Sequence, residues 1–89
     1  MTLQQLKYAV VTAEKGTVSE AAAALYIAQP SLTKAIKELE KEMGITIFHR
    51  TNKGVSVSKE GEVFLGYARQ VLEQASLITE KYVHQSGGK

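Results

Sequence analysis

The sequence predicts a mainly α-helical domain in which three helices and a two-stranded hairpin are followed by a long fourth helix. Three observations predict this class: apolar residues recur at helical spacing in four stretches, two short β-branched runs flank a polar turn, and glycine or proline separates most of these segments. The chain has 89 residues, 44% of them hydrophobic and 22% charged, which is typical of one small folded domain. We expect this domain in residues 1–57, the long helix in residues 58–86 and a flexible tail in residues 87–89.

The first 25 residues are predicted to form two helices. The apolar residues of the first helix share one face: Leu3, Leu6, Val10 and Ala13. Gly16 suits the left-handed conformation in which many helices end. Ser19 is expected to cap the second, shorter helix, and the alanines at positions 21–24 allow a neighbouring helix to approach closely.

A third helix is predicted to begin at Pro30, because proline in the first helical position loses no hydrogen bond. Gly44 ends it, and residues 26–29 join it to the second helix in a helix-turn-helix arrangement. Its apolar residues form one narrow stripe: Leu32, Ile36, Leu39 and Met43. Its other face carries hydroxyl groups and lysines: Ser31, Thr33, Lys34, Lys37 and Lys41. A DNA recognition helix needs both faces, since one fixes the helix to the domain and the other offers donors to base edges.

The segments 45–48 and 55–57 are expected to pair as a two-stranded hairpin. Asn52 and Gly54 lie between them and suit turn positions with positive φ. The hairpin tip is a candidate DNA contact through Arg50, Thr51 and Lys53, because basic side chains on a turn can lie over phosphates or enter a minor groove. A basic helix and a basic hairpin about twenty residues apart are typical of a winged helix-turn-helix. The formal net charge is only +2, with seven basic and five acidic residues in positions 1–57.

Residues 58–86 are predicted to form one helix, capped by Ser58, whose apolar residues alternate steps of four and three. Such a heptad pattern is typical of a helix that pairs with another helix. About 27 residues make roughly 40 Å of helix, which is more than the small domain can cover, although residues near Phe64 and Leu65 should pack on it. We therefore expect homodimerisation, and an inverted-repeat DNA target, through Phe64, Ala68, Val71, Leu72, Ala75, Ile78 and Tyr82.

Enzymatic chemistry finds no support in the sequence. Cysteine is absent, which excludes disulfides, a thiol nucleophile and a sulfur-based zinc site. His49 and His84 each lack a second ligand at metal spacing, and no serine has a histidine and aspartate at triad positions. No glycine-rich phosphate loop, membrane-length apolar run or secretory signal is visible. We expect no enzyme activity, no cofactor, no metal and a cytoplasmic location.

Six stretches that cover nearly the whole chain resemble the DNA-binding domain of LysR-type transcriptional regulators. They are LQQLKY (3–8), GTVSEAA (16–22), LYIAQPSLT (25–33), LE with a later glycine (39–40 and 44), FHR with a later glycine (48–50 and 54) and SKEG (58–61). Two positions depart from the family pattern: Ala28 replaces the usual serine and removes a hydroxyl, whereas Thr33 replaces a commoner serine and keeps one. The resemblance implies that the DNA face of the recognition helix comprises Gln29, Pro30, Ser31, Thr33, Lys34 and Lys37, and that Arg50 and Lys53 are the wing contacts.

The resemblance also implies a long linker helix that pairs two subunits on duplex DNA, within a full-length dimer or tetramer. Family members carry a larger effector-binding domain, of periplasmic-binding-protein type, that this chain lacks, so a small-molecule inducer would act only through that missing domain. Two other functions remain open. The long helix could pair with a different protein while the winged fold binds no DNA, or it could lie on a membrane surface. The balance of four basic and four acidic residues in positions 58–89 disfavours the membrane.

Overall fold

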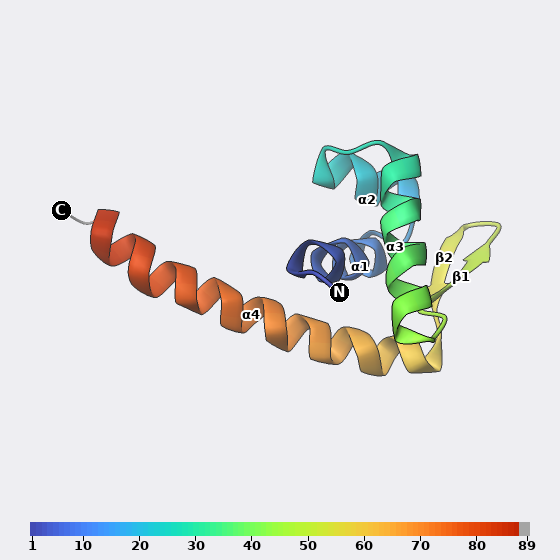
Figure 1. Cartoon of the computed structure of the whole chain (residues 1–89). Coiled ribbons are helices and arrows are strands. Elements are labelled where there is room, and N and C mark those ends of the chain that lie inside the picture. Colours follow the sequence, from blue (N-terminus) through green and yellow to red (C-terminus); the bar gives the residue numbers. More distant parts are fainter. Residues whose placement is uncertain (88–89) are drawn as a thin grey trace.

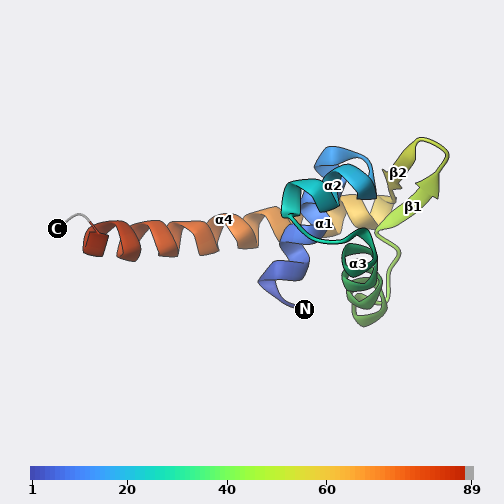
Figure 2. The same ribbon diagram turned by 90° about the horizontal axis from the view of Figure 1, so that it is seen from above.

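The computed structural model describes residues 1–87, and side chains for residues 1–83. Its elements are α1 (Leu3–Lys15), α2 (Val18–Leu25), α3 (Gln29–Met43), β1 (Phe48–Thr51), β2 (Gly54–Val57) and α4 (Lys59–Gly87). Helices α1, α2 and α3 form a cluster, the β1–β2 hairpin projects from one side, and α4 leaves the cluster as a long arm (Figures 1 and 2). The molecule measures 51 × 25 × 19 Å. The predicted fold class, a winged helix-turn-helix with a long fourth helix, is confirmed, whereas the expected tail beyond Gly87 lies outside the described residues.

The ends of α1 follow from local hydrogen bonding. Thr2 Oγ1 accepts a hydrogen bond from the Gln5 N–H, and Gln5 Oε1 accepts one from the Thr2 N–H, both at 3.0 Å. This reciprocal pair satisfies two amides at the start of the helix. Gly16 ends the helix with φ +82°, as the sequence predicts. Further along the chain, Ser58 Oγ accepts a hydrogen bond from the Gly61 N–H at 2.8 Å, so the predicted cap of α4 is also present.

The predicted start of α2 is wrong by two residues. Thr17, not Ser19, caps the helix, because its Oγ1 accepts the Glu20 N–H at 3.1 Å while its own backbone is extended. A helix that begins at Val18 places that side chain against the small core of α2 and α3. Both residues carry a hydroxyl group, so the cap preference alone could not choose between them.

The turn of the helix-turn-helix holds one strained residue. Tyr26 ends α2 with φ +58°, a left-handed conformation in which a side chain carries an energetic penalty. Its side chain is 94% exposed. Replacing Tyr26 by glycine should therefore raise the free energy of unfolding by about 1 kcal/mol relative to Tyr26→Ala, which keeps the strain. Urea unfolding followed by circular dichroism measures the difference, and equal midpoints for the two variants would contradict it.

Two boundaries near the candidate site also differ from prediction. Helix α3 begins at Gln29, so Pro30 occupies the second helical position rather than the first, and the preceding Ala28 gives no side-chain cap. The first strand is Phe48–Thr51 rather than 45–48, since Ile47 is fully buried in the core instead of pairing with a second strand. Gly54 has a positive φ as expected, whereas Asn52 does not.

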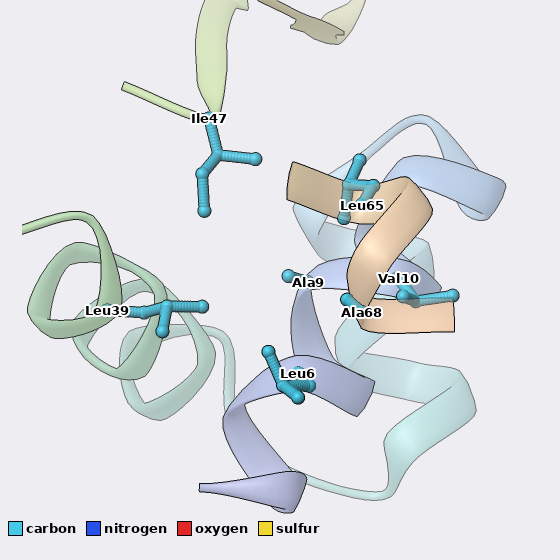
Figure 3. Packing of buried hydrophobic residues seen from close by; sticks show 7 residues of the cluster. All are labelled: Leu6, Ala9, Val10, Leu39, Ile47, Leu65 and Ala68. Atoms are coloured by element: carbon cyan, nitrogen blue, oxygen red, sulfur yellow. The ribbon is translucent and has the colours of Figure 1, made fainter. Parts of the chain in front are cut away.

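The core that carries these elements lies between α1, α3 and the start of α4. Its side chains converge from separate segments of the chain (Figure 3): Leu6, Ala9, Val10, Leu39, Ile47, Leu65 and Ala68. Ala21, Ala22, Leu32 and Ile36 form a second cluster that joins α2 to α3. The first turns of α4 are therefore part of the domain, and its later turns form the arm.

Candidate nucleic-acid interface

Helix α3 has two faces of opposite character. Leu32 and Leu39 are fully buried and Ile36 is 6% exposed, which fixes the orientation of the helix. The residues predicted to contact DNA are exposed, except Thr33, which is half-buried: Gln29, Pro30, Ser31, Thr33, Lys34 and Lys37. A shallow hollow at the start of the helix is lined by Gln29, Pro30, Thr33 and Lys34. The surface thus presents a hydroxyl, an amide and an ammonium group side by side, which suits recognition of base edges.

The wing is a tight antiparallel hairpin. Arg50 pairs with Val55 and Thr51 with Gly54, which leaves a two-residue turn. The predicted contact residues Arg50, Thr51 and Lys53 are all exposed. The β2 strand is held against the domain because the Val55 N–H donates to the Gly16 carbonyl at 2.9 Å. A Cβ atom on Gly54 would lie 2.2 Å from that same carbonyl oxygen, so this close approach requires glycine.

The exposed end of the wing contacts α3 through Arg50. The Arg50 guanidinium donates a long hydrogen bond of 3.5 Å from Nη2 to Thr33 Oγ1. A hollow between the two elements is lined in part by Thr33, Lys37, Glu40, Phe48 and Arg50. Figures 1 and 2 show the hairpin beside α3. Helix α3 and the wing therefore form one exposed surface, with Lys34, Lys37, Arg50 and Lys53 as its cations.

Glu40 belongs to this region, although the sequence gives no sign of it. Its Oε2 accepts the Ile47 N–H at 2.7 Å and the Phe48 N–H at 3.1 Å, at the entrance to β1. In the sequence it is one of three glutamates at positions 38, 40 and 42, which together look like a solvated charged face. No pattern in a single sequence distinguishes a carboxylate that binds distant loop amides from one that faces water.

His49 lies away from the candidate contact surface. It follows Phe48 on β1, and successive side chains of a strand point to opposite faces, so it faces away from Arg50. It lines a shallow hollow with residues from the end of α3 and the start of α4. Among residues with described side chains, no three potential metal ligands lie together, and the side chain of His84 lies outside that range. No described helix is both long and apolar enough to span a bilayer.

The residues predicted to form the dimer seam divide into three groups. Ala68 is 2% exposed and belongs to the domain's own core, so its side chain is already covered within this chain. Three others are half-buried: Phe64, Leu72 and Ala75. Three are exposed along the arm: Val71, Ile78 and Tyr82. Leu77 and Val83 are also exposed and extend the apolar surface beyond the predicted set.

Comparisons with known proteins agree with this geometry. The family model described as "Bacterial regulatory helix-turn-helix protein, lysR family" matches residues 3–62. The HTH-type transcriptional regulator TfdT of Cupriavidus pinatubonensis is 46% identical over 72 residues, which are 81% of this chain and 32% of TfdT. ClcR of Pseudomonas putida is 40% identical over 72 residues, which are 81% of this chain and 24% of ClcR. The chain therefore spans about a third or less of the length of these curated relatives.

Solved structures give the same result. The crystal structure of the BenM DNA-binding domain with catB site 1 DNA superimposes with a TM-score of 0.91 at 32% identity, and the match covers 100% of both chains. The complex of the CbnR DNA-binding domain with DNA gives a TM-score of 0.87 at 30% identity, again over 100% of both chains. The family model covers most of this chain, and the structural match extends over its whole length. The chain belongs to the LysR family of bacterial regulatory helix-turn-helix proteins.

Proposed function

We propose that this chain binds duplex DNA sequence-specifically, as the DNA-binding part of a transcription regulator that acts in the bacterial cytoplasm. The observation that carries the proposal is the single exposed surface formed by the basic face of α3 and the basic wing, which meet at Arg50 and Thr33. The likeness to two domains solved as DNA complexes supports it. Nothing in this function requires a cofactor or an enzymatic step.

The residues divide into two roles under this proposal. The start of α3 enters the major groove, where Gln29, Ser31, Thr33 and Lys34 meet base edges and Pro30 packs against them. Lys37, Arg50, Thr51 and Lys53 contact phosphates or the minor groove. If Lys37, Arg50 and Lys53 of two subunits each neutralise one phosphate, the slope of log K against log salt is about −5.

We propose a homodimer, which the exposed apolar residues of the arm support. Two copies paired through α4 hold two recognition helices at a fixed separation, so the target is an inverted repeat. The curated relatives are three to four times as long as the matched region. We propose that a small-molecule inducer acts through an effector-binding domain outside this chain, which can also assemble the dimer into a tetramer.

Affinity selection of random duplexes by this chain at about physiological salt, followed by sequencing, tests the proposal. An inverted repeat among the recovered duplexes supports both sequence-specific binding and the dimer. Recovery without any shared sequence, which disappears as salt rises, contradicts sequence-specific recognition by this chain. If no duplex is recovered, the alternative function is favoured, in which α4 pairs with a different protein.

Base-contacting and phosphate-contacting lysines are expected to behave differently. Lys34→Ala should weaken binding to the selected site by about 1–3 kcal/mol and have much less effect on a mixed-sequence duplex. Lys53→Ala should weaken both duplexes alike and lower the magnitude of the salt slope by about 1 for each phosphate that is no longer neutralised. Fluorescence anisotropy titrations at several salt concentrations measure both quantities. Equal decreases in affinity on the two duplexes for Lys34→Ala would contradict its assignment to base edges.

A further inference from the structure

Glu40 joins the recognition helix to the base of the wing. Its Oε2 accepts the backbone N–H groups of Ile47 and Phe48 at 2.7 and 3.1 Å, and β1 begins at Phe48. The Ile47 carbonyl is held from the other side, since it accepts the Ser58 N–H at 2.9 Å. Ile47 is fully buried. The start of the wing is thus fixed to α3 by a carboxylate and to the start of α4 by a backbone hydrogen bond.

The path of β1 then runs along the same face of α3. Glu40 and Thr33 are seven residues apart, which is about two helical turns and places both side chains on one side of the helix. The strand begins beside Glu40, and Arg50, two residues after Phe48, reaches Thr33 Oγ1. Both elements contribute to the hollow between them, which Glu40 and Arg50 line together. The position of Arg50 over α3 therefore depends on where the strand starts.

We propose that Glu40 is a positioning residue for DNA binding: its carboxylate fixes the wing at the distance from α3 at which Arg50 reaches the DNA that α3 contacts. This inference rests on the proposed function, because it presumes that Arg50 contacts DNA. Within the residues whose side chains are described, Glu40 forms no ion pair with a basic side chain, and its hydrogen bonds go to backbone amides. The cations of the surface consequently remain available for phosphates.

The charge of Glu40 makes the proposal sharply testable. A carboxylate near a phosphate backbone repels it, so a purely electrostatic role predicts that any neutral replacement tightens DNA binding. A positioning role predicts different results for different replacements. Glu40→Gln keeps an oxygen that can accept both amide hydrogens, whereas Glu40→Ala has no acceptor and Glu40→Asp keeps the charge on a side chain one methylene shorter.

We expect Glu40→Ala and Glu40→Asp to weaken DNA binding about tenfold, and Glu40→Gln to bind as tightly as the parent chain or more tightly. The probe is the duplex recovered by the affinity selection, with a mixed-sequence duplex as a second probe. Glu38→Ala is the matched control, because Glu38 is an exposed carboxylate on the same helix. It should leave binding unchanged or tighten it. Tighter binding by all the neutral Glu40 variants would overturn the proposal.

A double-mutant cycle shows whether Glu40 acts through the wing. Glu40→Ala should lower affinity less than about twofold in a chain that already carries Arg50→Ala, whereas its effect should add fully to that of Lys34→Ala. Additive effects of Glu40→Ala and Arg50→Ala would overturn the inference. If Glu40→Ala does not fold, the same cycle with Glu40→Asp, which retains a charged acceptor on the helix, decides the question.

Different results would contradict the assignment of the wing and the positioning role of Glu40. If Arg50→Ala alone binds DNA as tightly as the parent chain, the assignment of the wing in the proposed function is wrong. If Arg50→Ala weakens binding while Glu40→Ala and Glu40→Asp do not, that assignment stands and the positioning role of Glu40 is wrong. Circular dichroism of every variant shows whether it is folded at the temperature of the binding measurement.

Discussion

Replacing Gly61 by alanine is expected to lower the free energy of unfolding by about 3 kcal/mol or to prevent folding altogether. A Cβ atom at this position would lie 2.4 Å from the carbonyl oxygen of Ile47 and 3.0 Å from its Cα. It would also lie 3.0 Å from a methyl carbon of Val57. The carbonyl cannot move away easily, because Ile47 is fully buried and its oxygen accepts the Ser58 N–H at 2.9 Å. Chemical denaturation followed by circular dichroism measures the change in stability.

Gly66 is the matched control for Gly61, since it lies in the same helix. A Cβ atom on Gly66 would meet nothing within 4 Å. Alanine should therefore stabilise the chain by about 1 kcal/mol through its higher helix propensity. Opposite signs for the two substitutions are the expected result. A stabilising Gly61→Ala would show that α4 does not cross the Ile47 segment as closely as this structure has it.

The contrast between these glycines also shows what the sequence could and could not predict. Helical periodicity, the glycines that end α1 and α3, and the hydroxyl that caps α4 are local signals, and they located the helices to within two residues. Both Gly61 and Gly66 look equally unfavourable for a helix from their sequence alone. Only the packing of α4 against Ile47 makes one of them necessary.

The observed position of the first strand, Phe48–Thr51, differs from the predicted one for a related reason. Ile45 and Ile47 are β-branched, which favours a strand. In the structure, Ile47 instead fills the core and donates its N–H to the Glu40 carboxylate. Strand propensity does not distinguish a β-branched residue that pairs in a strand from one that is buried in the core. The same limit explains Glu40 itself, since its partners are seven and eight residues away and are backbone groups with no sequence signature.

Exposure is easier to predict from the sequence for α3 than for α4. On α3 the apolar and basic residues occupy opposite faces, so burial of the apolar face leaves the basic face exposed. On α4 the heptad pattern covers both the turns that pack on the domain and the turns that extend past it. Spacing alone therefore placed the buried Ala68 in the same set as the exposed Ile78.

Replacing Ile78 by glutamate is expected to convert the proposed dimer to a monomer and to weaken binding to an inverted repeat about 100-fold. Ile78 is 62% exposed, between Val71 and Tyr82 on the arm, and the arm lies beyond the domain's own core. A buried charge at a helix–helix seam has no partner and is strongly unfavourable. Two unlinked subunits bind the two half-sites independently, so the second subunit no longer gains the high effective concentration that pairing provides. Light scattering reports the mass, and anisotropy titration reports the affinity.

Ser76→Glu is the control, because Ser76 is exposed on the arm two residues earlier and therefore faces nearly the opposite side of the helix. It should leave both the mass and the affinity unchanged. Ile78→Glu should also leave the thermal stability of the winged domain and its binding to a single half-site unchanged, since neither the core nor the α3 surface is touched. A persistent dimer in Ile78→Glu would mean that the seam follows other residues of α4. A monomer that still binds the full repeat tightly would mean that pairing through α4 does not contribute to recognition.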